Sequence, residues 1–180
     1  METCRRARWP MLSAEAKLIR EDALMPTIEP ALLADIPALV ALLQALFARE
    51  REFTPNPDLQ RQGLELILAR PSSGQVFVAR DGADVLGMVS LLFTVSTALG
   101  APVCWLEDMV VRGDARGRGI GSRLVAQALA HAHGRGFARV TLLTDADNAG
   151  ARRFYQRHGF AASDMVAMRW LSPVEAGFRS

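Results

Sequence analysis

The sequence predicts an α+β fold, with a mixed and mostly antiparallel central sheet flanked by about four helices. Three observations lead to this class. Between residues 75 and 111, extended apolar runs alternate with turn signals, as in an antiparallel meander. A glycine- and arginine-rich turn then precedes a stretch whose apolar residues recur at helical spacing. A short apolar run at Val140 to Leu143 follows and completes a strand–helix–strand unit.

The chain has 180 residues, of which 50% are hydrophobic and 22% charged, as expected for a packed globular core. We expect one domain over residues 25–180. Residues 1–24 are charged, interrupted by a proline and without a sustained period, so we expect a disordered leader. The alternative is a short helix from Ser13 to Leu24.

Composition argues against several classes of protein. The net charge of +2 is too small to predict a nucleic-acid partner. No apolar run approaches the roughly 18 residues that a membrane-spanning helix needs, and no signal peptide is evident, so the cytoplasm is the expected compartment. The two cysteines, Cys4 and Cys104, do not suggest a disulfide framework or a zinc site. The three histidines, His131, His133 and His158, do not predict a metal site either.

The first elements follow from local signals. Residues Thr27 to Glu29 suit a short strand. Asp35 is an expected N-cap, with Pro37 in the first helical turn, and apolar residues at helical spacing extend this helix to about Glu50. A second helix is expected from Asp58 to Ala69.

Three strands are expected next. Residues Gln75 to Arg80 and Val85 to Thr97 flank an Asp81-Gly82 turn and should form a hairpin. Within the longer strand, Gly87 predicts a bulge or a close approach of another backbone segment. Residues Val103 to Val111 form the third strand of the meander.

After the glycine-rich turn, the pattern predicts a helix from about Gly119 to His133 and then the buried strand at Val140 to Leu143. Asn148 is the expected cap of a short helix that runs to about His158. Residues Met165 to Leu171 are expected to close the sheet as its last strand.

The glycine-rich turn carries the first functional signal. Gly117, Gly119 and Gly121 expose backbone N–H groups and permit positive φ, and the following helix adds unpaired N–H donors and a positive dipole end. Arg116 and Arg118 add charged donors. These features predict a site for a phosphate or pyrophosphate.

Two common phosphate motifs do not fit this turn. A Walker A loop requires a lysine after its last glycine, where this chain has Ser122. The dinucleotide fingerprint does not fit because the third glycine comes one residue early. A glycine-rich surface turn without function is the alternative interpretation.

At this point the sequence resembles a known family. Arg116-x-x-Gly119-x-Gly121 matches the R/Q-x-x-G-x-G/A signature of the GCN5-related N-acetyltransferases, and residues 106–111 resemble the fourth strand of that family. A second motif, Asn148-x-x-Ala151-x-x-Phe154-Tyr155-x-x-x-Gly159-Phe160, resembles the helix that lies beside the thiol end of coenzyme A in the family. The resemblance covers roughly residues 27–171.

The resemblance implies a GNAT-type acyl-CoA N-acyltransferase fold, acetyl-CoA as co-substrate and no metal. It implies that the Val110 N–H faces the thioester carbonyl and that the Val111 backbone pairs with the pantetheine arm. The cofactor-binding residues that it implies are Met109, Val110, Val111, Arg116, Gly117, Arg118, Gly119, Ile120, Gly121, Ser122, Asn148, Ala151 and Phe154.

Two residues are candidates for catalysis. Tyr155, the only tyrosine in the chain, corresponds to the family residue that protonates the departing thiolate, and a phenol is protonated at neutral pH. Glu107 is the expected base that removes a proton from the amine. Asp108 competes for this role, because adjacent strand residues point to opposite faces and a bulge in the strand would change which residue faces the cleft.

The expected reaction is direct attack of a primary amine on acetyl-CoA in a ternary complex, with a small-molecule amine favoured. Specificity in this fold comes mainly from residues 47–62 and 93–102, where Arg49 or Arg51 would suit an amine that carries an anionic group. The alternatives are a peptide or protein N-acetyltransferase and a non-catalytic acyl-CoA-binding module. The resemblance is also compatible with a homodimer.

Overall fold

The computed structural model describes residues 25–50 and 52–170, and within them a five-stranded sheet with four α-helices. The helix proposed for residues 13–24 lies outside the described residues. The elements in chain order are β1 (Thr27–Pro30), the 3₁₀ turn η1 (Leu33–Asp35), α2 (Ile36–Phe47), α3 (Pro57–Leu68), β2 (Gly74–Asp81), β3 (Asp84–Ser96), β4 (Ala101–Val111), the 3₁₀ turn η2 (Gly113–Ala115), α4 (Ile120–Gly134), β5 (Val140–Leu142) and α5 (Ala149–Arg157).

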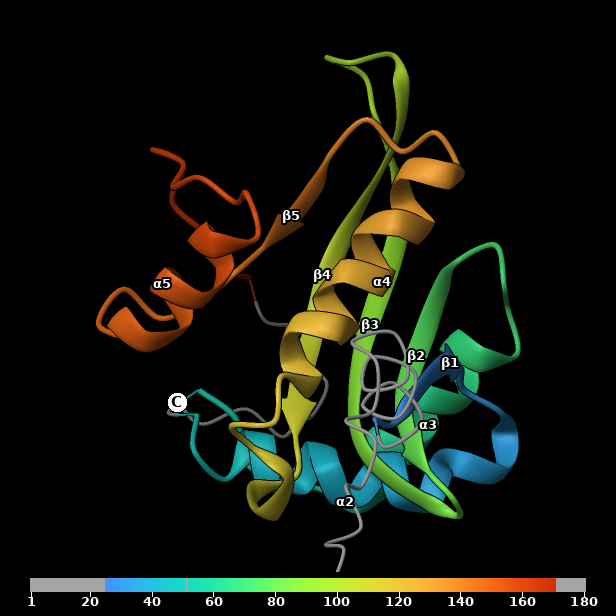
Figure 1. Ribbon diagram of the computed structural model, residues 1–180. Helices are drawn as coiled ribbons and strands as arrows, with labels where there is room; N and C mark the ends of the chain where they lie inside the picture. The colour runs from blue at the N-terminus through green and yellow to red at the C-terminus, as the bar shows by residue number, and fades with distance from the viewer. Residues whose placement is uncertain (1–24, 51, 171–180) are drawn as a thin grey trace, which may run out of the picture.

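The strands lie in the sheet in their order along the chain, β1-β2-β3-β4-β5 (Figure 1). The first four pair antiparallel, and β5 pairs parallel to β4 after the crossover through α4. The predicted α+β class and mixed, mostly antiparallel sheet are therefore confirmed. The hairpin predicted at Asp81-Gly82 is present, with Gly82 at φ +58°.

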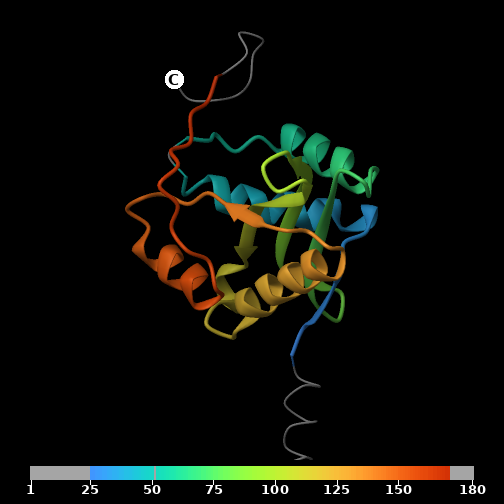
Figure 2. The same ribbon diagram turned by 90° about the horizontal axis from the view of Figure 1, so that it is seen from above.

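Helices cover both faces of the sheet (Figure 2). On one face, α4 packs over a core that includes Phe77, Val89, Leu91 and Leu124. On the other face, α2 and α3 pack over a second core. This core includes Leu39 of α2 and the strand residues Val76, Val78, Met88 and Val110. The alternation of β4 side chains between these two layers is what places Met109 and Val110 on opposite sides of the sheet.

Both alternatives predicted for Gly87, a bulge and a close approach of another backbone segment, are confirmed. The β2–β3 register pairs Ala79 with Gly87 and Arg80 with Val85, so Leu86 is an extra residue on β3. A Cβ atom at Gly87 would lie 2.8 Å from the Val110 carbonyl oxygen, so no side chain fits there. Glycine thus allows β3 and β4 to lie close together beside the glycine-rich turn.

Two predictions on element boundaries were wrong. The first α-helix ends at Phe47 rather than near Glu50. Residues 165–170 form no strand, and their apolar side chains Met165, Val166, Met168 and Trp170 are 84–94% exposed; Leu171 lies outside the described residues. Apolar character alone does not make a strand, which needs ladder partners, and β5 spans only three residues at the sheet edge. Arg169 instead pairs with Glu52, in the connection between α2 and α3.

Candidate active site

The site forms where β4 and β5 separate. Their parallel pairing ends at Leu106 and Leu142, and β4 continues beside β3 to Val111 while the chain after β5 leads away towards α5 (Figure 1). Beyond Leu106, the edge of β4 that faces away from β3 is therefore not paired with β5. Backbone N–H groups along this edge can pair with an extended ligand, in the manner of an added strand.

The register identifies which N–H groups lie on this edge. Arg112 donates its N–H to the Leu86 carbonyl at 2.8 Å, and Val110 lies opposite Met88 two residues before. Because hydrogen-bonded and non-hydrogen-bonded pairs alternate in an antiparallel ladder, Val110 directs its N–H towards β3. The backbone groups of Met109 and Val111 point to the opposite side, into the opening beside β5.

A bulge interrupts β4 just before these residues. Between the pairs Val89–Met109 and Leu91–Leu106, Ser90 alone lies opposite both Glu107 and Asp108. Strict alternation would have placed Leu106 and Met109 on opposite faces, but both pack in the core under α4. The bulge that was considered from the sequence is therefore present.

The bulge holds Asp108 in a defined position. Its backbone N–H donates to Ser90 Oγ at 3.0 Å, and the Ser90 hydroxyl lies 3.2 Å from Asp108 Oδ2, where it can donate in return. Ser90 is buried. Glu107, the other bulge residue, is exposed. The structure thus separates the two candidate bases into one held carboxyl and one solvent-facing carboxyl.

Burial and neighbouring charge alter the protonation of these acids. Burial and the negative charge of Glu107 together raise the pKa of Asp108 to about 6, although the Ser90 hydrogen bond acts in the opposite direction. Burial also raises the pKa of Glu50 to about 7, together with the charges of Asp108, Asp145 and Glu52, whereas Arg169 lowers it. Carboxylates from three separate segments therefore gather near the bulge.

Glu50 and Asp145 were not predicted to be parts of this site. Each lies in a connecting segment without regular structure, one after α2 and the other between β5 and α5. The only available signal was the mixed charge of residues 49–52, which did not indicate what those residues would face. Their proximity to Asp108 depends on the tertiary fold.

The glycine-rich turn has the predicted backbone. Gly117 and Gly119 adopt φ of +76° and +78°, a region that side chains disfavour, and α4 begins at Ile120. The Arg116 Nε donates to the Val111 carbonyl oxygen at 3.0 Å, which ties the turn to the open edge of β4. Arg118 lies 4.0 Å from Asp81. The unpaired N–H groups at the start of α4 thus follow directly on the open strand edge.

The two predicted motifs are in contact. His158 Nε2 lies 3.1 Å from Ser122 Oγ, and a Cβ atom at Gly121 would lie 3.5 Å from the Phe154 ring. The predicted cap of α5 is confirmed, because Asn148 Oδ1 accepts the Ala151 N–H at 3.0 Å. The start of α4 and the side of α5 therefore form one wall of the opening. The His158 contact was not foreseen from the sequence.

Tyr155 lies on this wall. It packs with Met109 and Val111 against the core under α4, and its ring centroid lies 5.2 Å from that of Phe154 and 5.6 Å from that of Phe160. Burial raises the pKa of the Tyr155 hydroxyl to about 12. The phenol is therefore protonated at neutral pH and can donate a hydrogen bond.

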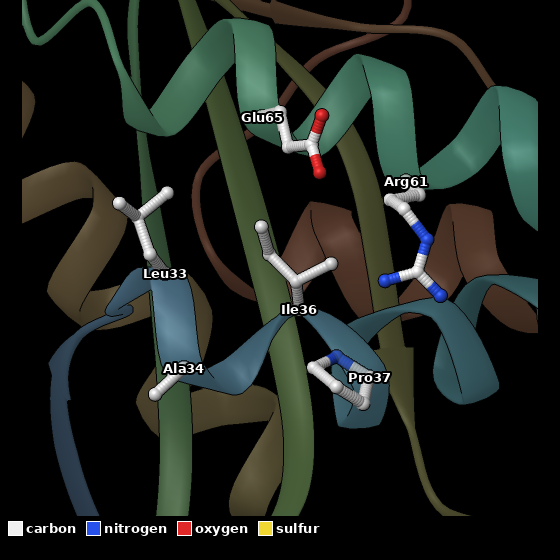
Figure 3. A pocket seen from close by; sticks show the side chains of 6 residues that line it. All are labelled: Leu33, Ala34, Ile36, Pro37, Arg61 and Glu65. Atoms are coloured by element: carbon white, nitrogen blue, oxygen red, sulfur yellow. The ribbon is translucent and has the colours of Figure 1, made fainter.

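Two cavities border the layer of α2 and α3. One, of about 480 Å³, is lined by η1, the start of α2 and the side of α3 that faces them, and contains no residue of either motif (Figure 3). Apolar side chains line it, with Arg61 and Glu65 of α3 extending over it (Figure 3). The second, of about 320 Å³, lies between α2 and the end of β4, and includes Val111 and Arg116. Only the second adjoins the candidate site.

Residues 25–50 and 52–170 contain no group of three or more His, Cys, Asp or Glu side chains arranged to hold a metal ion. Over the same residues, no helix is both long and apolar enough to cross a bilayer.

Comparisons with known proteins agree with the fold. Residues 38–160 match the acetyltransferase (GNAT) family. The chain is 31% identical to glucosamine 6-phosphate N-acetyltransferase 1 of Oryza sativa subsp. japonica, over 87% of this chain and 93% of that protein. It is 29% identical to the aminoalkylphosphonate N-acetyltransferase of Salmonella typhimurium, over 80% and 92%. A crystal structure of a transcriptional regulator from Bacillus halodurans superposes with a TM-score of 0.69 at 31% identity, over 81% of this chain and 99% of that one.

Proposed function

The chain belongs to the acetyltransferase (GNAT) family and is an acetyltransferase, and we propose that it transfers the acetyl group of acetyl-CoA to the primary amine of a small molecule. The carrying observation is the open edge of β4, which runs from the bulge at Asp108 to the N–H groups at the start of α4. Such an edge suits one extended ligand with a diphosphate at one end and a thioester at the other. Both substrates are held together, so the amine attacks the thioester directly.

In this proposal the diphosphate binds the backbone N–H groups of residues 117–122, and the pantetheine arm pairs with Val111. The thioester oxygen lies at the Met109 N–H rather than at the Val110 N–H, because the ladder directs Val110 towards β3. Ala151 and Phe154 of α5 border the opposite side of the arm. A single well-placed N–H donor stabilises the tetrahedral oxyanion by roughly 3 kcal/mol.

Asp108 is the proposed base. A carboxylate with a pKa of about 6 is mostly ionised at neutral pH, yet accepts a proton more readily than an ordinary aspartate. Its contact with Ser90 orients it beside the residue that holds the thioester. Glu107, the base expected from the sequence, is exposed, and its proposed role is to raise the pKa of Asp108.

Tyr155, the general acid expected from the sequence, is proposed to stabilise the departing thiolate. Because a thiol with a pKa of about 8.5 is a stronger acid than this phenol, complete proton transfer to the thiolate is uphill. The hydroxyl therefore acts mainly as a hydrogen-bond donor to the sulfur as negative charge develops there. The proton that neutralises the thiolate ultimately derives from the amine.

Two relatives support a small-molecule acceptor. Their names specify glucosamine 6-phosphate and aminoalkylphosphonate, which are small amines that carry a phosphoryl or phosphonate group. The chain covers more than nine tenths of each relative, so neither has a large additional domain for binding an acceptor.

The test is release of free coenzyme A thiol from acetyl-CoA, measured against a panel of small amines and against peptides with free N-termini or lysines. The proposal expects amine-dependent release with at least one small amine. Release with peptides alone would indicate a peptide N-acetyltransferase. Binding of acetyl-CoA without release for any acceptor would indicate an acyl-CoA-binding module instead.

The proposed assembly is a homodimer. No strand of the described residues pairs with the outer edge of β5, and residues 165–170 expose four large apolar side chains. A second copy presents both features in return, so the two chains can cover each other's apolar segment. Light scattering after size exclusion tests this: a monomer mass at micromolar concentration would contradict it.

A further inference from the structure

The second cavity is lined in part by charged residues, such as Arg49, that have no role in the proposed reaction. We call it the arginine groove, and it is bounded by α2, by the β2–β3 turn and by the end of β4 with the following loop. Its volume is about 320 Å³, and its lining residues are Ala38, Ala41, Leu42, Ala45, Arg49, Ala83, Asp84, Val85, Val111, Arg112, Gly113 and Arg116. Four alanines and a glycine line it, so short side chains leave the space open.

The groove has a cationic lining. Three arginines, Arg49, Arg112 and Arg116, line it against the single acid Asp84. Arg112 is largely neutralised, because it pairs with Asp114 at 2.7 Å and with Asp84 at 3.5 Å. The surplus positive charge therefore belongs to Arg49 and Arg116.

These two arginines approach from separate elements. Arg116 uses its Nε to bind the Val111 carbonyl, a bond that leaves the four N–H groups on its terminal nitrogens without a hydrogen-bond acceptor among residues 25–50 and 52–170. Arg49 follows the last turn of α2 and is exposed. The helix dipole favours a cation such as Arg49 at the C-terminal end of α2. It does not explain why the Arg116 guanidinium lines the same groove.

We propose that the arginine groove is a second phosphoryl-binding subsite, in which Arg49 and Arg116 hold a phosphate or phosphonate group of a ligand bound beside the glycine-rich turn. Guanidinium groups bind phosphoryl oxygens through paired, charge-assisted hydrogen bonds. This inference rests on the proposed function, because the groove adjoins Val111 and Arg116 of the cofactor site. The phosphoryl group belongs either to the 3′-phosphate of coenzyme A or to the acceptor amine.

The test variant is Arg49→Gln, and the matched control is Arg61→Gln, which changes an exposed arginine beside the other cavity. Calorimetry compares acetyl-CoA with its 3′-dephospho form, and 3′,5′-adenosine diphosphate with adenosine 5′-phosphate. Steady-state kinetics compares glucosamine 6-phosphate with glucosamine, phosphoethanolamine with ethanolamine, and 2-aminoethylphosphonate with propylamine. Loss of one charged contact should weaken binding by about tenfold or more.

If the group is the cofactor's 3′-phosphate, Arg49→Gln weakens acetyl-CoA and 3′,5′-adenosine diphosphate but leaves both forms without the 3′-phosphate unchanged. If the group belongs to the acceptor, the wild type prefers the phosphorylated member of an amine pair, and Arg49→Gln raises KM for that member with little change in kcat. Arg61→Gln leaves every value within twofold in either case.

Equal weakening of both cofactor forms would place Arg49 on the diphosphate and overturn a separate subsite. The proposal would be overturned if the wild type gave equal Kd or KM values for both members of every ligand pair. It would also be overturned if Arg49→Gln gave the wild-type values for all ligands. In either case the acetyltransferase assignment stands. A wild type that binds no acetyl-CoA but whose affinity for 3′,5′-adenosine diphosphate falls in Arg49→Gln would refute the cofactor site alone.

Discussion

Replacement of Asp108 by asparagine separates the proposed base from its exposed neighbour. The Asp108→Asn variant keeps a side chain of similar shape whose amide oxygen can still accept the Ser90 hydrogen bond, but this side chain cannot take a proton at neutral pH. General-base catalysis contributes about 10²–10⁴-fold, so kcat/KM for the amine should fall by at least about 100-fold. The Kd for acetyl-CoA should change by less than about threefold, because the loop and β4 edge remain.

The pH profile gives a sharper readout than the rate alone. In the wild type, kcat/KM should fall as the pH drops through about 6, where Asp108 becomes protonated. Glu107→Gln removes a nearby negative charge and should move this limb to lower pH. Ser90→Ala removes a hydrogen bond that favours the carboxylate and should move it to higher pH. Glu50 titrates nearby at about 7, so Glu50→Gln is the control in which the limb persists.

The same shift predicts a change in stability. The folded pKa of about 6 lies above the ordinary value of 3.8, so the folded state binds this proton more tightly than the unfolded state. The ionised carboxylate therefore destabilises the fold in full above about pH 6, and this effect is relieved progressively as the pH falls from about 6 to 3.8. At pH 7.5, Asp108→Asn should raise the free energy of unfolding by up to roughly 2–3 kcal/mol in urea denaturation.

An active Asp108→Asn enzyme would refute this reasoning. The decisive result would be that Asp108→Asn keeps at least half of the wild-type kcat/KM while kcat/KM of Glu107→Gln falls about 100-fold. That result would return the base to Glu107, the residue expected from the sequence.

Three further predictions test the rest of the site and the core. Tyr155→Phe should lower kcat by at least about tenfold without changing the calorimetric Kd for acetyl-CoA, and an unchanged kcat would remove the hydroxyl from the mechanism. Arg116→Ala combined with Gly119→Asp should abolish acetyl-CoA binding, because Gly119 has φ +78° and an acidic side chain there would repel phosphate. If the double variant kept its affinity for acetyl-CoA and a native circular dichroism spectrum, the diphosphate site would be contradicted. His131 packs between the Phe77 and Phe93 rings with Nε2 unpaired among the described residues, and burial lowers its pKa. Its contribution to the free energy of unfolding should therefore fall as the pH drops below about 6.5, opposite in sign to the contribution of Asp108. His131→Leu should remove this contribution when denaturation at pH 5 is compared with pH 7.5, and an unchanged difference would exclude His131 as its source.

Local signals were sufficient to predict the parts of the site that depend on backbone conformation. The glycines at 117 and 119 indicated positive φ, and Asn148 indicated a cap, because each effect is decided within a few residues. The meander followed from turn residues between apolar runs. Gly87 pointed to a close approach of backbone, although its partner, Val110, could not be named in advance.

The residues that meet across two elements could not be named from the sequence. At the bulge in β4, Ser90 on β3 is hydrogen-bonded to Asp108 on β4, and no pattern within either strand encodes that pairing. The ladder phase that directs the Met109 N–H outward follows from the same register. The strand expected at residues 165–171 fails for the opposite reason over residues 165–170, because the apolar pattern is present there but these residues pair with no strand in the described part of the chain.

A crystal structure with bound acetyl-CoA tests the central claim most directly. We predict the diphosphate on the N–H groups of residues 117–122 and the thioester oxygen about 2.7–3.1 Å from the Met109 nitrogen, with the sulfur towards Tyr155. A cofactor bound outside the opening between β4 and β5, or a thioester oxygen that the Met109 N–H does not reach, would contradict the account.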